Sequence, residues 1–151
     1  MRIYFNTSAL NRPFDDLAST RVRLEAEAVV ALLEAVEDGL VEWVGSDYLD
    51  FEISQDPDPE RVRRVGSLAE LARRRVVVSG AVTERAKSLE RTGLRGLDAL
   101  HVASAEAGEA DLLVTTDDRM LRRSRRAGLA LAVRIVTPVE AVELVSRRTQ
   151  R

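Results

Sequence analysis

The chain has 151 residues with 23 basic and 25 acidic side chains, a single histidine and no cysteine. This composition excludes disulfides and thiolate metal sites, and the net charge of −2 does not indicate a protein that binds nucleic acid by its overall charge. No apolar run approaches the about 20 residues of a membrane span, and the first residues lack the long apolar region of a signal peptide. We therefore expect one cytoplasmic domain over residues 1–151.

The first half of the chain alternates short apolar runs with helical patterns. It predicts strands at 3–5 and 40–44, and helices at 20–38, 47–54 and 60–74. Gly39 ends the first helix, and Ser46 or Asp47 can cap the second. Pro57 and Pro59 separate the last two helices. The polar segment 11–16 is expected to be a loop.

The second half repeats this alternation. It predicts strands at 76–78, 112–117 and 132–136, and helices at 83–91, 98–107, 119–127 and from Thr137 onward. Pro138 suits the first position of the last helix. Strands that alternate with helices indicate a three-layer α/β/α domain, with a mainly parallel central sheet of about five strands.

The segment from Gly96 to Asp118 carries the clearest functional signal. A helix of about ten residues covers about 15 Å, and the strand after it returns about 20 Å. Asp98 and Asp117 are therefore expected at the same edge of the sheet. Ligands of open parallel sheets bind beyond the carboxyl ends of the strands, and carboxylates gathered there need a cation or a proton.

Four segments point to a known family. IYFNTSALNRPFDD, SDYLDFEIS, GLDALHVASA and LVTTDDRML occur in this order and together resemble the PIN-domain nucleases, the fold of VapC-like toxins. DALHVASA followed by TTD is the most specific part of the resemblance. The resemblance implies metal-assisted hydrolysis of phosphodiesters, with one or two Mg²⁺ or Mn²⁺ ions held through oxygen ligands.

The resemblance also implies the site residues. The positions that hold the metal in the family correspond to Asn6, Glu52, Asp98 and Asp117, with Thr7, Ser8 and Asp118 as nearby polar support. The family has aspartate where this chain has asparagine at position 6. An amide oxygen can coordinate Mg²⁺ but brings no negative charge and accepts no proton. We therefore expect weaker metal binding and low nuclease activity.

Each aspartate of this set also has a purely structural explanation. Asp98 is a carboxylate in the first turn of a helix, where it interacts with the positive end of the helix dipole. Asp117 and Asp118 can form a turn and cap the next helix. We expect Asp118 to be the cap and Asp117 the metal ligand.

The roles of Glu52 and His101 depend on which side chains lie near them in the fold. Glu52 is preferred from the resemblance, while Asp47 and Asp50 compete with it on the same short helix. His101 follows Asp98 by three positions, and we expect it to support the site by packing or hydrogen bonding rather than to act as a base. Trp43 is expected in the core.

A run of arginines follows Asp117, at positions 119, 122, 123, 125 and 126. Such a run is usually a solvated helix face, in which charges four residues apart repel. Because it follows the acidic edge, Arg119, Arg122 and Arg123 are also candidates to hold a substrate backbone, an interaction that weakens steeply with salt.

The leading functional hypothesis is a Mg²⁺- or Mn²⁺-dependent endoribonuclease that acts on single-stranded or looped RNA, as the toxin of a toxin–antitoxin pair. The resemblance implies a homodimer and a small antitoxin that covers the acidic groove. The alternative is a catalytically inactive PIN-like domain that binds RNA or a protein. A phosphatase or another metal-dependent phosphoryl hydrolase remains a third possibility, because the same carboxylates could serve small substrates.

Overall fold

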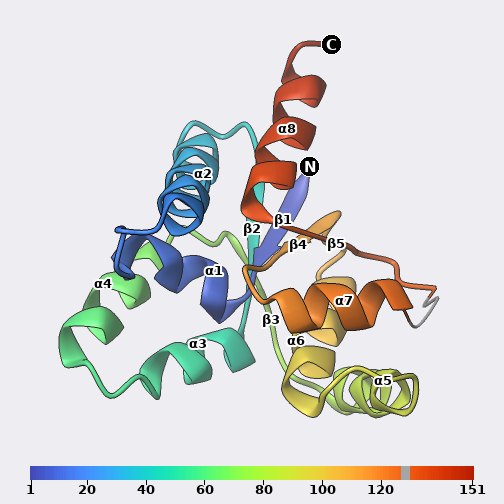
Figure 1. Ribbon diagram of the computed structural model, residues 1–151. Helices are drawn as coiled ribbons and strands as arrows, with labels where there is room; N and C mark the ends of the chain where they lie inside the picture. The colour runs from blue at the N-terminus through green and yellow to red at the C-terminus, as the bar shows by residue number, and fades with distance from the viewer. Residues whose placement is uncertain (127–129) are drawn as a thin grey trace.

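The computed structural model describes residues 1–126 and 130–151, which contain a five-stranded sheet (Figure 1). The strands are β1 (Arg2–Phe5), β2 (Glu42–Ser46), β3 (Arg74–Val76), β4 (Leu112–Val114) and β5 (Arg134–Val136). Their order in the sheet is β3-β2-β1-β4-β5, and every neighbouring pair is parallel. The predicted parallel sheet of about five strands is confirmed, and the carboxyl ends of all these strands lie at one edge.

Helices cover both faces of the sheet. They are α1 (Thr7–Asn11), the 3₁₀ helix η1 (Arg12–Phe14), α2 (Thr20–Glu37), α3 (Asp47–Ser54), α4 (Pro59–Ala69), α5 (Gly80–Arg91), α6 (Gly96–Ala107), α7 (Asp118–Arg126) and α8 (Pro138–Thr149). On one side, α2 packs against α8, which contacts β4. On the other side, α6 contacts β2, β3 and β4, and α5 packs against α6 (Figure 1). Within the described ranges, no helix combines the length and apolar character needed to cross a membrane.

The central strand β1 is buried on both faces. Ile3, Tyr4 and Phe5 are each 0% exposed, which is typical of a strand in a parallel sheet covered by helices. Trp43 of β2 is also fully buried, and its ring meets that of Phe5 edge to face with the centroids 5.1 Å apart. The expected core position of Trp43 is therefore confirmed.

Strand β2 starts two residues later than the predicted range 40–44. Gly39 has a positive φ of 73°, and the amides of Leu40 and Val41 both donate to the Ala35 carbonyl. These two residues therefore form the turn after helix α2 rather than the start of β2, because the left-handed glycine turns the chain back over the last helical turn.

The predicted helix 60–74 and strand 76–78 are wrong at their shared boundary. Helix α4 ends at Ala69, and β3 pairs Arg74, Arg75 and Val76 with Val44, Gly45 and Ser46 of β2. Val77, which was expected inside the strand, is 67% exposed. The register with β2 selects the strand residues here, and a local apolar pattern carries no information about that register.

Strands β4 and β5 are shorter than predicted. Strand β4 ends at Val114 rather than at 117, although the Thr115 amide still donates to the Val136 carbonyl. Strand β5 begins at Arg134 rather than at 132. The three residues after β4 therefore connect the strand to helix α7 at the carboxyl edge of the sheet.

The remaining differences concern helix ends. The sequence did not predict α1, which Asn6 caps, and η1 occupies part of the expected loop 11–16. Helix α5 begins at Gly80, behind a Ser79 cap, rather than at 83. The predicted end of the arginine-rich helix at Ala127 lies outside the described residues, and α7 is described to Arg126. Helices α2 and α8 begin as predicted, with Ser19 and Thr137 as caps.

Gly108 allows α6 to lie close to the sheet, and its replacement tests that packing. A Cβ atom at Gly108 would overlap Val44 Cγ1 and would lie 2.8 Å from Val76 Cγ2. We expect Gly108→Ala to lower the free energy of unfolding by about 1–3 kcal/mol, because the end of α6 must move away from the sheet or the two valine side chains must shift. Urea denaturation followed by the fluorescence of Trp43 measures this change.

Gly66 provides the matched control. It lies inside α4, and a Cβ atom there would have nothing within 4 Å. Gly66→Ala should raise the free energy of unfolding by about 0.5–1 kcal/mol, because alanine has the higher helix propensity. Equal effects of the two substitutions would contradict the close packing at Gly108.

Candidate active site

The candidate site lies at the carboxyl edge of the sheet. Asn6 follows β1, Asp117 comes shortly after β4, and Glu52 and Asp98 lie on α3 and α6. Figure 1 shows α1, α3, α6 and α7 grouped around this edge. The structure therefore brings the predicted residues to one edge, but it gives them different surroundings.

Asp98 and Asp117 line the same hollow, which has a volume of about 520 Å³. Arg119 and Arg123 also line it, so the two carboxylates face positive charge. Asp98 is half-buried in the first turn of α6. Burial raises the pKa of Asp98 above its usual value, and the charges of Asp117 and Glu52 raise it further, against the effects of His101 and Arg123. The two aspartates are close enough to repel each other.

Asp117 also caps helix α7. Its Oδ1 accepts hydrogen bonds from the amides of Arg119, at 2.9 Å, and Met120, at 3.3 Å. The expectation that Asp118 is the cap is therefore wrong. Asp118 is the first residue of the helix and binds the guanidinium of Arg21 through both oxygens, at 2.9 and 2.6 Å. Asp117 is the cap because it immediately precedes the helix, where its side chain can accept hydrogen bonds from the first free amides of α7. These hydrogen bonds also orient its side chain.

Glu52 is held by hydrogen bonds from two sides. Its carboxylate lies 3.2 Å from His101 Nε2 and accepts a hydrogen bond from the Thr7 hydroxyl. Burial alone would raise its pKa, but the interaction with His101 and the hydrogen bonds from Thr7 and Tyr48 outweigh it and lower the pKa of Glu52 to about 2. The competing acids are placed elsewhere: Asp50 pairs with Arg75 at 2.7 Å, and Asp47 is exposed. Of these three acids, Glu52 is therefore the one that faces α6.

His101 links Glu52 to the core. The ring is 2% exposed, and its Nδ1 lies 2.7 Å from the Tyr4 hydroxyl. That hydroxyl lies 2.8 Å from Ser46 Oγ, which also caps α3 by accepting from the Leu49 amide. The sequence did not indicate that Tyr4 and Ser46 take part in this series of hydrogen bonds. The available signal was the tyrosine in a fully apolar strand, because a buried phenol needs a partner.

Asn6 is buried, and both ends of its amide are engaged. Its Oδ1 accepts from the Ser8 hydroxyl at 2.7 Å and from the Ala9 amide at 3.3 Å, and its Nδ2 donates to Thr115 Oγ1 at 2.9 Å. The same Thr115 oxygen accepts from the Asp117 amide at 3.1 Å. Asn6 thus caps α1 and is connected to Asp117 through Thr115. Thr7 and Ser8 have separate partners, Glu52 and Asn6.

The arrangement of the carboxylates shows which residues could bind the divalent ion that the resemblance implies. In the described part of the chain, no group of three or more histidine, aspartate or glutamate side chains is arranged to hold an ion. Asp98 and Asp117 nevertheless form a mutually repelling pair in one hollow. Mg²⁺ is usually bound by one or two carboxylates, with water and substrate phosphate as the other ligands. The pair therefore fits Mg²⁺ or Mn²⁺, whereas Glu52 and Asn6 are engaged by neighbouring groups.

The comparison with known families agrees with this geometry. The family model of the PIN domain matches residues 3–126, most of the chain. The chain belongs to the PIN domain family. The resemblance found in the sequence is thus confirmed. No curated protein matches this PIN domain.

A solved structure shares the fold. A chain in the crystal structure of VapBC2 from Rickettsia felis, bound to a DNA fragment from their promoter, is similar with a TM-score of 0.56 and 14% identity. The similarity covers 91% of this PIN domain and 98% of the other chain. At this identity the similarity concerns the fold, so the role of the site depends on its own residues.

The two carboxylates with shifted pKa values should affect stability in opposite directions. The folded-state pKa of Asp98 is raised, so its ionisation disfavours the folded state as the pH rises through that value. Glu52 has a lowered pKa of about 2 and stabilises the fold above its ordinary value of 4.5. At neutral pH without divalent cations, we expect Asp98→Asn to raise the free energy of unfolding and Glu52→Gln to lower it.

Urea denaturation between pH 2 and 7 measures both effects. The gain from Asp98→Asn should disappear below the ordinary pKa of 3.8, and the loss from Glu52→Gln should fade as the pH falls from 4.5 toward 2. Mn²⁺ should stabilise the unchanged protein more than Asp98→Asn, because the ion binds only the folded state. Effects of the same sign at neutral pH would contradict the described surroundings.

Proposed function

We propose that this PIN domain is a divalent-cation-dependent endoribonuclease and the toxin of a toxin–antitoxin pair. The observation that carries the proposal is the Asp98–Asp117 pair, which lines one hollow together with arginines at the carboxyl edge of a PIN fold. Carboxylates beside guanidinium groups suit a phosphodiester, because the acids attract a cation and the arginines bind phosphate oxygens.

Asp98 and Asp117 would hold the ion. A bound Mg²⁺ or Mn²⁺ would lower the pKa of a water molecule and stabilise the charge that develops on phosphate oxygens. Asp117 is prepared for this role, because the α7 amides fix its side chain. Asp98 presents its carboxylate from the first turn of α6, beside Asp117.

Glu52 would contribute charge rather than proton transfer. A carboxylate with a pKa of about 2 is a poor base near neutral pH, since efficient general bases have pKa values close to the working pH. Thr7 and His101 hold it in a fixed orientation. In this proposal Glu52 orients water or an ion ligand at the edge, and His101 is a positioning residue.

The substrate in this proposal is single-stranded or looped RNA, whose backbone and bases are accessible. Arg119 and Arg123, which line the hollow of the two aspartates, would hold the cleaved part of the strand. Arg122 lies outside that hollow and would contact the strand only beyond the cleaved phosphodiester. The VapBC2 complex with a similar fold supports a small antitoxin as partner. A homodimer and a cytoplasmic location belong to the same proposal.

A second candidate is a PIN domain that binds RNA or a protein without cleavage. It is favoured by Asn6, which replaces a charged ligand of the family and is used as a helix cap. It is also favoured by the lack of a group of three possible metal ligands within residues 1–126 and 130–151. The two candidates differ in turnover but share the hollow and the arginines.

Cleavage of a mixed-sequence, partly looped RNA in Mn²⁺ distinguishes them. The unchanged protein, Asn6→Asp and Asp98→Asn should be compared side by side. We expect slow cleavage by the unchanged protein, faster cleavage by Asn6→Asp because a carboxylate adds charge for the ion, and none by Asp98→Asn. EDTA should abolish cleavage by both active proteins.

Each other outcome has a defined meaning. Cleavage by Asn6→Asp alone would make this chain a nuclease scaffold without its first carboxylate. If none of the three proteins cleaves any RNA tested, the non-cleaving alternative replaces the nuclease. Unchanged cleavage by Asp98→Asn would remove the Asp98–Asp117 pair from the mechanism.

A further inference from the structure

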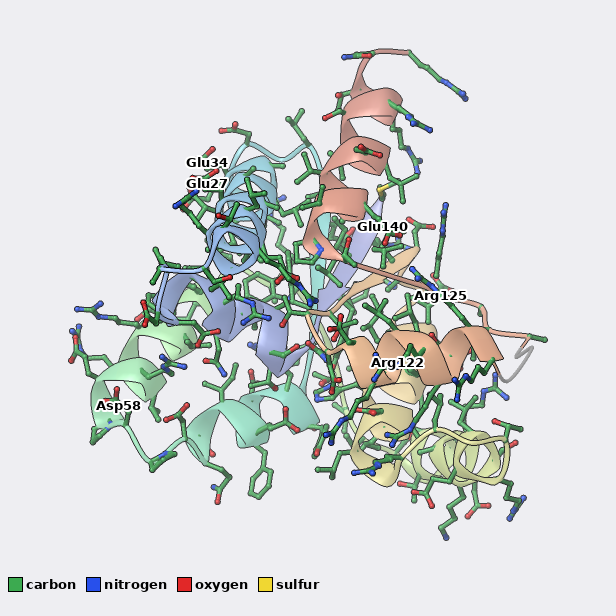
Figure 2. The ribbon with its side chains drawn as sticks, in the orientation of Figure 1. Glu27, Glu34, Asp58, Arg122, Arg125 and Glu140 are labelled. Carbon is green, nitrogen blue, oxygen red and sulfur yellow. The ribbon has the colours of Figure 1, made fainter. Side chains whose placement is uncertain are left out.

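A second hollow, of about 390 Å³, is lined only by arginine side chains. They are Arg95, Arg119, Arg122, Arg123 and Arg126, which we call the arginine pocket. Arg95 precedes helix α6, and the other four belong to α7, so two separate segments contribute. Figure 2 shows nitrogen-tipped side chains gathered between α7 and the start of α6, near the labelled Arg122.

The arginine pocket concentrates positive charge, and no acidic residue among those that the structure describes lines it. In the described ranges, no ion pair joins one of its five arginines to an acid. Arg125 of the same helix differs, because it lies toward Glu140 of α8 and pairs with it at 3.3 Å (Figure 2). Arg122 and Arg126 are four positions apart on α7, where like charges repel. An anion in the pocket would relieve this repulsion.

The arginine pocket is continuous with the hollow of the two aspartates. Arg95, Arg119 and Arg123 line both, whereas Arg122 and Arg126 line only the arginine pocket. An anion that occupies the arginine pocket would therefore be a direct neighbour of a group bound at Asp98 and Asp117. Two anionic groups at such neighbouring positions occur in the backbone of a nucleic acid strand.

We propose that the arginine pocket binds a phosphate of the RNA strand that is not cleaved, next to the phosphodiester held at Asp98 and Asp117. The inference rests on the proposed function, since it assumes that the strand reaches the aspartate pair. Guanidinium groups bind phosphate through paired hydrogen bonds. The pocket then sets a minimum substrate: at least two consecutive phosphates, one for each hollow.

Binding of labelled single-stranded RNA, measured in the Asp98→Asn background, tests the pocket without cleavage. The test protein is a double variant with Arg122→Gln and Arg126→Gln, because these two side chains line only the arginine pocket. The matched control is Arg125→Gln, on the same helix but paired with Glu140. Circular dichroism and thermal unfolding should show that all variants remain folded.

We expect the double variant to weaken RNA binding at least about tenfold, since two hydrogen bonds between charged groups are lost. The slope of the logarithm of the binding constant against the logarithm of salt concentration should become shallower by about 0.7, the value for one phosphate of a single strand. The control should leave both quantities unchanged. An unchanged affinity and slope in the double variant would overturn the proposal, as would an equal loss in the control.

Two further measurements are needed. The first distinguishes RNA from an acidic protein segment as the ligand of the arginine pocket, and the second distinguishes this inference from the proposed nuclease function. If the double variant loses binding of polyglutamate but keeps its RNA affinity, the pocket serves an acidic protein segment and the inference is wrong. With active protein, the double variant should raise KM for an RNA octamer but not for a dinucleoside monophosphate, whose single phosphate is the one cleaved. Equal changes in KM for both substrates would overturn the inference while leaving the nuclease intact.

Discussion

The structure depends on the burial of β1 at the centre of a fully parallel sheet. Ile3, Tyr4 and Phe5 have no exposed surface, and the strand pairs with β2 on one side and β4 on the other. Because the neighbours run in the same direction, everything that follows them meets at one edge. The backbone continues this order beyond β1, since the Asn6 amide donates to the Val114 carbonyl at 3.1 Å. The geometry of the candidate site is thus set by an apolar strand.

A series of hydrogen bonds connects the buried strand β1 to the candidate site at the edge of the sheet. The Tyr4 hydroxyl meets both His101 and Ser46, and His101 in turn meets Glu52. Burial raises the pKa of Tyr4 well above its usual value, so the phenol remains a hydrogen-bond donor. A satisfied buried network of this kind allows few alternative arrangements. It therefore holds Glu52 in place while leaving the Asp98–Asp117 pair strained by its own charge.

The edge is electrostatically divided. Asp98 and Asp117 share a hollow with Arg119 and Arg123, and the positive surface continues into the arginine pocket. Asp118 belongs to neither part, because Arg21 ties it to helix α2. A hollow that combines carboxylates with guanidinium groups, next to one lined by arginines, suits an extended anion that brings a cation with it better than a small neutral ligand.

The sequence by itself determined the fold class, the family, the core position of Trp43 and the meeting of Asp98 and Asp117 at one edge. The fold class, the position of Trp43 and the meeting of the two aspartates follow from periodicity and helix signals along the chain. The family follows from the resemblance of four segments to the PIN-domain nucleases. Strand register, as at β3, and the choice of Asp117 over Asp118 as the α7 cap could not be predicted in this way, because they depend on partners distant in the chain or on the helix start. The engagement of Asn6 with Thr115 and the joining of Arg95 to the α7 arginines were likewise decided only by the tertiary structure. Hydrogen bonding and charge clustering act between neighbours in space, whereas a sequence pattern records only neighbours along the chain.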